Sequence, residues 1–193
     1  MDNTSMKNEV IYQESPNWSS RLIGRLSKAQ VVALAQDLHH DEHGISEVYG
    51  MMLQSDDARL ATNAAWVLAH LSAADRTLYL FPYYDELVDL AISPSLIIRR
   101  GLVFAILLAL PDREELRADL LDFCLNRMAD GKLEDSTRSY MIKLAARLCR
   151  PYPELIDELA LCLQVLPLEG LSPSIVCARR KALVSIGKPL FEY

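Results

Sequence analysis

The chain has 193 residues, of which 51% are hydrophobic and 24% charged, and its formal net charge is −6 at pH 7. Such an apolar composition excludes a disordered chain, and the negative charge argues against broad affinity for nucleic acid, which requires a net cationic surface. The charge is uneven, because residues 1–97 hold 6 Lys and Arg against 13 Asp and Glu, whereas residues 98–193 hold 14 against 13. The second half therefore has room for a local basic strip.

The first residues are polar and contain no basic start followed by an apolar run, so the sequence predicts no signal peptide. We expect residues 1–17 to form a mobile tail and residues 18–193 to form a single helical domain. The longest apolar stretch, residues 101–110, is shorter than the roughly 20 residues that a membrane span requires. A cytoplasmic protein without membrane contact is the expectation.

Apolar residues recur at helical spacing along the chain, and alternating strand patterns are almost absent, so the sequence predicts an all-α fold. Ser27 begins the first helix, for which Gly44 marks the stop, and Asp56 or Asp57 caps a later one. Ser93 is the expected cap, and Pro94 the first turn, of a strongly apolar helix that ends at Pro111. The predicted helices cover 27–38, 45–54, 59–71, 82–90, 93–111, 116–128, 136–149, 155–166 and 173–187, and Phe191 is expected to cover the last exposed face.

Two segments nearly repeat each other. Ser93-Pro94-Ser95 leads to Arg99-Arg100, and Ser172-Pro173-Ser174 leads to Arg179-Arg180, a separation of 80 residues. A similar helical segment that contains Arg138 lies between them and divides the separation into two units of about 40 residues, the length of a pair of helices in a repeat protein. The chain is therefore predicted to be a stack of helix pairs.

The segment from Asp56 to Leu68 has an acidic turn, an arginine, small residues and an apolar helix, and it resembles the second helix of a HEAT repeat. The resemblance implies a right-handed α–α superhelix, a short solenoid of the HEAT or armadillo type. In that family the arginine commonly pairs with an acidic or carbonyl group in the adjoining turn, a role that suits Asp57 and Asp135. We expect most of these arginines to be structural, and ligand contact is expected mainly from the second member of each Arg-Arg pair.

The second helices of a solenoid line its concave surface, the usual binding face. In the first of these second helices, residues at i, i+4, i+7 and i+11 form one stripe on the side away from the apolar face. Shifting these positions by the repeat length gives the corresponding stripe in each of the next three second helices. The candidate binding residues are Arg59, Asn63, Trp66 and His70, then Leu102, then Tyr140, Lys143 and Arg147, and finally Lys181 and Lys188.

Together these stripes predict a groove that is aromatic and polar at one end, apolar in the middle and cationic at the other. The groove suits a protein or peptide with an apolar centre and an acidic flank, bound by a non-catalytic scaffold. Two simpler interpretations stay open. Trp66 packs against the neighbouring repeat, or the apolar stripe of residues 102–109 is covered by the chain's own tail or by a second copy in a homodimer.

The cluster from His39 to His43 is the one place with metal-ligand chemistry, since His39 and His43 have the i, i+4 spacing that can hold one ion. No separated third ligand is marked, so a solvated helix end is favoured and neither metal nor cofactor is predicted. Four scattered cysteines, Cys124, Cys149, Cys162 and Cys177, are expected to be buried and reduced.

No short catalytic motif is present. The alternative function is a DNA-binding protein or an enzyme similar to the alkylpurine DNA glycosylases, which are built from HEAT-like repeats and use aromatic, acidic and basic groove residues. Trp66, Tyr140, Lys143, Arg147 and Lys181 superficially suit that resemblance. The acidic net charge and the apolar middle helix weigh against it, because a DNA groove should be basic throughout.

Overall fold

The computed structural model describes residues 17–166 and 170–188, and within these ranges all regular structure is helical. Residues 1–16 of the tail expected over residues 1–17, and Phe191, lie outside the described residues, whereas Asn17 caps α1. The helices are α1 (Trp18–Leu22), α2 (Lys28–Asp37), α3 (Glu42–Gln54), α4 (Ala58–Leu68), α5 (Ala73–Asp75), α6 (Tyr84–Ile92), α7 (Arg100–Ala109), α8 (Ala118–Arg127), α9 (Asp135–Cys149), α10 (Pro153–Gln164) and α11 (Pro173–Ser185). A π-helical turn (Arg76–Leu80) and a 3₁₀ turn (Phe81–Tyr83) join α5 to α6.

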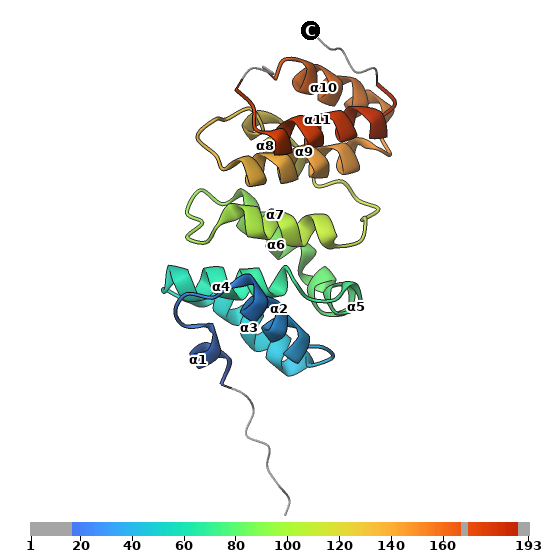
Figure 1. The fold of residues 1–193 in the computed structure, drawn as a ribbon. Helices are drawn as coiled ribbons and strands as arrows, with labels where there is room; N and C mark the ends of the chain where they lie inside the picture. The colour runs from blue at the N-terminus through green and yellow to red at the C-terminus, as the bar shows by residue number, and fades with distance from the viewer. Residues whose placement is uncertain (1–16, 167–169, 189–193) are drawn as a thin grey trace, which may run out of the picture.

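Pairs of helices stack one upon another along the molecule, from α3 and α4 through α6 and α7, then α8 and α9, to α10 and α11 (Figure 1). The second helices α4, α7, α9 and α11 pack side by side in one continuous layer. Helix α2 packs against α4, the first helix of this layer. This second-helix layer confirms the predicted all-α solenoid architecture.

One hydrophobic core runs through the whole stack, from Trp18 in α1 to Ile186 after α11. Helix α4 contributes small buried residues, Ala61, Ala64 and Ala65, which leave room for close packing of its neighbours. None of the helices in the described ranges 17–166 and 170–188 is both long and apolar enough to cross a membrane.

An arginine joins the two helices of each of the last three pairs; Arg100 is partly buried, and Arg138 and Arg179 are buried. Arg100 donates to the carbonyls of Ala91 and Ser93, Arg138 Nε donates to the Met128 carbonyl at 2.9 Å, and Arg179 Nε donates to the Leu163 carbonyl at 2.6 Å. The last carbonyls of a helix lack intrahelical partners, and a nearby cation interacts favourably with that end of the helix. The structural role predicted for these arginines is confirmed.

The structural role falls on a different member of the Arg-Arg pair in each of the two repeated segments. Arg100, the second member of its pair, makes the structural contacts that were expected mainly of the first member, whereas in the other pair Arg179 is structural and Arg180 is exposed. Both structural arginines stand seven residues after the serine of their segment, at Ser93 and Ser172. Asp57 does not pair with an arginine, because its side chain caps α4 by accepting from the backbone N–H groups of residues 59 and 60.

The predicted start of the apolar helix at Ser93 and Pro94 is wrong, since α7 begins at Arg100. Ser93 instead follows the end of α6, and its hydroxyl accepts from the backbone N–H of Ser95 in a local turn. Arg100 binds the carbonyls that precede this turn and so holds residues 93–99 outside the helix. The matching segment behaves as predicted, because Ser172 and Pro173 do begin α11.

Gly44 is not the stop of a helix, because α3 already begins at Glu42. Asp41 caps α3 by accepting from the Gly44 N–H at 2.9 Å, and the left-handed residue of this turn is His40, with φ of 60°. A Cβ atom on Gly44 would lie 2.8 Å from both Leu38 and the Trp18 indole nitrogen. The glycine is therefore required by close packing inside the helix and not by a turn.

Candidate functional site

The outward stripe of α4 contains a tryptophan that its neighbours hold in place. Trp66 is partly exposed, and the His70 Nδ1 donates to the Trp66 carbonyl at 2.9 Å. The two rings meet edge to face, with centroids 6.4 Å apart. Seven residues earlier on the same helix, about two turns away, Arg59 is exposed. Three of the four residues predicted for this stripe, Arg59 and Trp66 in α4 and His70 just after it, are thus at least partly exposed.

Asn63, the fourth, is placed elsewhere. Its side chain is buried, and its Nδ2 donates to the carbonyls of Leu22 at 2.8 Å and Gly24 at 2.9 Å. Asn63 therefore holds the segment between α1 and α2 against α4, and it has no surface for a partner. The result of this bond is that Arg25, the next residue after Gly24, stands beside the α4 stripe.

Arg25, Arg59, Arg99 and Trp66 line one cleft of about 500 Å³. We call this site the arginine–tryptophan cleft; Gly24, Leu26, Thr62 and Asn63 complete its lining. The three guanidinium groups come from different elements, namely the α1–α2 segment, the start of α4 and the segment before α7. The sequence analysis found Arg59 and Trp66 but missed Arg25 and Arg99 as members of one site.

Two apolar side chains accompany these arginines. Ile23, two residues before Arg25, is 65% exposed, and Ile97, two residues before Arg99, is 55% exposed. Arg99 also forms a surface ion pair with Glu134 at 2.9 Å. The cleft therefore offers cationic and aromatic groups, and an exposed isoleucine lies two residues before each of two of its arginines in the chain.

The middle of the second-helix layer is apolar but not widely open. Leu102 of α7 is partly buried and packs against the core. On the next helix Tyr140 is partly buried, and the Lys143 ammonium lies 5.4 Å from the Tyr140 ring centroid. Lys143 itself is exposed.

Arg147 is used inside the fold. Its guanidinium donates to the carbonyls of Leu107, Leu108 and Leu110 at the end of α7, at 2.9, 2.8 and 2.9 Å, and its Nε lies 3.1 Å from Asp112. These contacts occupy the donors that a partner would need. Its position at a helix end, four residues after an exposed lysine, gave no sequence signal of this role.

The last predicted residues lie on or after α11. Lys181 is exposed, whereas Lys188 forms an ion pair with Asp157 of α10 at 2.6 Å. Five exposed cations on or beside the second-helix layer form no ion pair with any described residue: Arg25, Arg59, Lys143, Arg180 and Lys181. Within the described ranges, a chain of negative net charge thus has exposed cations without an ion pair on α4, α9 and α11 of this layer and beside it at Arg25.

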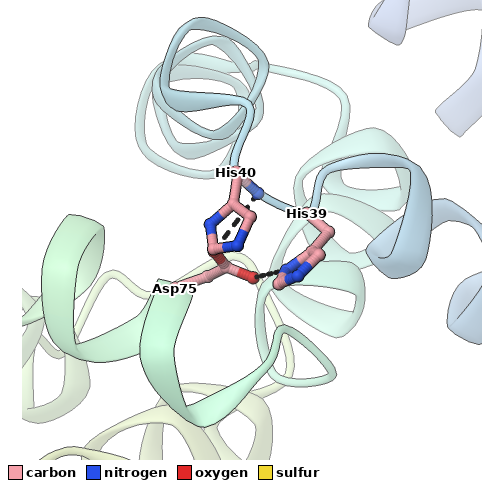
Figure 2. Close-up of side chains that lie close together, drawn as sticks. All are labelled: His39, His40 and Asp75. Atoms are coloured by element: carbon pink, nitrogen blue, oxygen red, sulfur yellow. Dashed lines mark hydrogen bonds and ion pairs between the residues drawn. The ribbon is translucent and has the colours of Figure 1, made fainter.

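A second cluster joins the α2–α3 turn to α5. His39 Nδ1 lies 2.8 Å from Asp75 Oδ2, and His40 Nδ1 lies 3.4 Å from Asp75 Oδ1, so both imidazoles point at one carboxylate (Figure 2). The Asp75 side chain is 1% exposed, and Ser72 Oγ donates to it at 2.6 Å. His43, the residue considered with His39 from the sequence, lies in α3 and is not part of this cluster.

The carboxylate of Asp75 stays ionised despite its burial. Burial by itself raises the pKa of Asp75, but hydrogen bonds from His39, Ser72 and the His40 backbone N–H outweigh it and lower the pKa below the ordinary value. The residue of this cluster that was not predicted from the sequence is therefore Asp75, an anionic side chain 36 residues from His39. Only the capping pattern from Ser72 to Asp75 marked this position in the sequence.

The cluster opens onto a cleft of about 340 Å³ next to the α4 stripe. Gln36, His39, Ser72 and Asp75 line this cleft, and so does His70, the partner of Trp66. The histidine–aspartate cluster and the arginine–tryptophan cleft thus lie on either side of the outward stripe of α4.

Comparison with known proteins gives one finding. Residues 18–186 match a protein family described as the HEAT repeat domain. No curated protein matches the chain, and no solved structure does.

Proposed function

Because this chain belongs to the HEAT repeat family over residues 18–186, we propose that it is a non-catalytic scaffold that binds a protein or peptide segment along its second-helix layer. The observation that carries the proposal is the arginine–tryptophan cleft. Arg25, Arg59 and Arg99, which come from three separate elements, line that cleft together with Trp66.

The chemistry of the cleft favours an acidic segment with an apolar or aromatic anchor. Guanidinium groups bind carboxylates through paired, charge-assisted hydrogen bonds, and Trp and Arg are the residue types most enriched among those that dominate interface energetics. Ile23 and Ile97 supply exposed apolar area beside the cations. A ligand that carries both acidic and apolar residues uses all of these groups.

The remaining exposed cations extend the binding path along the layer. Lys143 on α9, and Arg180 and Lys181 on α11, are exposed cations farther along the layer than the partly buried Leu102. In a chain of net charge −6 these cations would steer an acidic partner toward this layer. The four cysteines carry free thiols, which suits a reducing compartment, so we place the scaffold in the cytoplasm.

Selection from a random peptide display library tests the proposal. We expect enriched peptides to combine acidic residues with an apolar anchor. We also expect Arg59→Glu and Trp66→Ala each to weaken binding of a selected peptide by about tenfold or more, which corresponds to about 1.4 kcal/mol. The matched control is Lys132→Glu, which reverses an exposed charge in the turn between α8 and α9.

Three outcomes would redirect the account. Peptides that bind Arg59→Glu and wild type equally would move the site off the cleft. A gel mobility shift of a DNA oligonucleotide at low salt would favour the DNA-processing alternative if the double variant Lys143→Glu/Lys181→Glu abolishes that shift. A dimer that light scattering detects and that Leu102→Glu dissolves would assign the α7 face to self-association.

A further inference from the structure

We propose that His39, His40 and Asp75 form a binding site for a divalent transition-metal ion such as Zn²⁺. The three residues offer two imidazole nitrogens and a carboxylate oxygen, and their ligand atoms all lie within 4.8 Å of one another. This inference does not depend on the proposed peptide binding.

The spacing of the ligand atoms fits one ion. A tetrahedral zinc with bonds of about 2.0–2.1 Å holds its ligand atoms roughly 3.3 Å apart. His39 Nδ1 lies 2.8 Å from Asp75 Oδ2 and His40 Nδ1 lies 3.4 Å from Asp75 Oδ1, so each imidazole is near that spacing from one oxygen of the carboxylate. An ion would therefore replace the His39–Asp75 hydrogen bond and the longer His40–Asp75 ion-pair contact, with the imidazole nitrogens drawn toward one carboxylate oxygen.

The backbone places two consecutive histidines on the same side. Neighbouring side chains on a regular helix point about 100° apart, but the left-handed conformation of His40, with φ of 60°, redirects the chain after α2. The two imidazole rings then lie with centroids 3.8 Å apart and planes inclined by 33°. In Figure 2 both rings approach Asp75 from the turn that precedes α3.

The carboxylate is held before any ion arrives. Ser72 Oγ donates to Asp75 Oδ2, and the His40 backbone N–H donates to Asp75 Oδ1 at 3.3 Å. Such bonds to a ligating group fix its orientation and support metal affinity. Asp75 is almost fully buried beneath the rings, so the ionised group has few waters to lose when a metal binds.

The donor types select the class of ion. Two imidazoles and one carboxylate suit Zn²⁺, Co²⁺ or Ni²⁺, whereas Mg²⁺ and Ca²⁺ prefer oxygen ligands only. Three protein ligands leave at least one coordination position for water or for a side chain of a partner. The adjoining cleft, which His70 and Gln36 also line, gives access to that position.

The test is a titration of the full, chelator-treated chain with Zn²⁺ in a calorimeter, and with Co²⁺ by visible absorption. We expect one ion per chain, an intense Co²⁺ spectrum typical of low coordination number, and a rise in Tm on addition of Zn²⁺. His39→Ala and His40→Ala should each weaken binding about tenfold or more, and the double variant should lose it. Asp75→Asn should weaken it as well.

His43→Ala is the matched control, since His43 is an exposed histidine three residues from His40 that lies outside the cluster. His39 and His40 are themselves exposed, with 52% and 66% of their side chains accessible, so their removal leaves the core intact and circular dichroism should be unchanged. The proposal is overturned if wild type binds neither Zn²⁺ nor Co²⁺. It is equally overturned if the double variant binds them as wild type does, or if His43→Ala abolishes binding while the double variant retains it.

Discussion

Two adjacent arginines on α11 allow the energetic role of the buried arginines to be measured. Arg179 is 6% exposed and donates its Nε to the Leu163 carbonyl at 2.6 Å, whereas Arg180 is exposed. We predict that Arg179→Met destabilises the protein and that Arg180→Met has almost no effect. Methionine preserves much of the apolar stem of arginine, so the comparison isolates the guanidinium.

The expected magnitude follows from the bond that is lost. A hydrogen bond to a charged group contributes about 1.5–3 kcal/mol, and a buried carbonyl left without its partner adds to the loss. We therefore expect Arg179→Met to lower the free energy of unfolding by about 2 kcal/mol, and Arg180→Met to change it by less than about 0.5 kcal/mol. For a chain of this size the first value corresponds to a fall in Tm of about 4–8 °C.

Urea unfolding followed by circular dichroism at 222 nm is the assay, with the slope of the transition recorded for each variant. An unchanged slope reports loss of stability alone, and a shallower one reports that α10 and α11 unfold before the rest of the stack. Equal stability of the two variants would refute the argument that these arginines hold the helix pairs together. So would a larger loss in Arg180→Met.

Three further predictions concern other contacts. Asn63→Ala removes the two bonds to the Leu22 and Gly24 carbonyls and should cost about 1–3 kcal/mol in thermal or urea unfolding, with Thr62→Ala, its partly exposed neighbour, as the control that should stay near wild type. Gly44→Ala places a methyl group against Leu38 and Trp18 and should cost about 1–3 kcal/mol, whereas Gly50→Ala, where nothing lies within 4 Å, should be neutral or stabilising; equal losses would contradict the packing argument. Burial raises the pKa of Cys149 to about 11 and raises the pKa of Cys124 further. Iodoacetamide at pH 8 should therefore label the partly exposed Cys162 and Cys177, and peptide mass mapping should find Cys124 and Cys149 unlabelled until urea unfolds the chain. Labelling of Cys124 in the native protein would contradict its burial.

Helical periodicity was enough to predict the architecture from the sequence, because each helix buries an apolar face whose spacing is visible along the chain. The helix that begins at Ser172 and Pro173 was predicted correctly, but the near-identical segment at Ser93 and Pro94 stays outside its helix. The two segments differ in what the matching arginine binds: Arg100 donates to Ala91 and to Ser93 itself, whereas Arg179 donates to Leu163, nine residues before Ser172. A tertiary contact thus overrides a local capping signal.

The sites were harder to predict because they combine residues far apart in the chain. Arg59 and Trp66 share one helix and were found together, whereas Arg25 and Arg99 join them only through packing and through the Asn63 bonds. Asp75 meets His39 across 36 residues, a distance that no local spacing indicates. Arg147 and Lys188 have the sequence context of surface cations. In the structure Arg147 donates to backbone carbonyls at the end of α7, and Lys188 forms an ion pair with Asp157.

Binding at the arginine–tryptophan cleft is best tested by nuclear magnetic resonance of the two tryptophans during titration with a library-selected acidic peptide. The chain contains only Trp18 and Trp66, so two indole N–H signals report on two different places, and Trp66→Phe assigns them. Trp18 is 1% exposed in the core and serves as the internal control. We predict that the Trp66 signal shifts saturably with the peptide while the Trp18 signal stays fixed. Saturable binding that leaves the Trp66 signal unmoved would contradict the assignment of the cleft as the binding site.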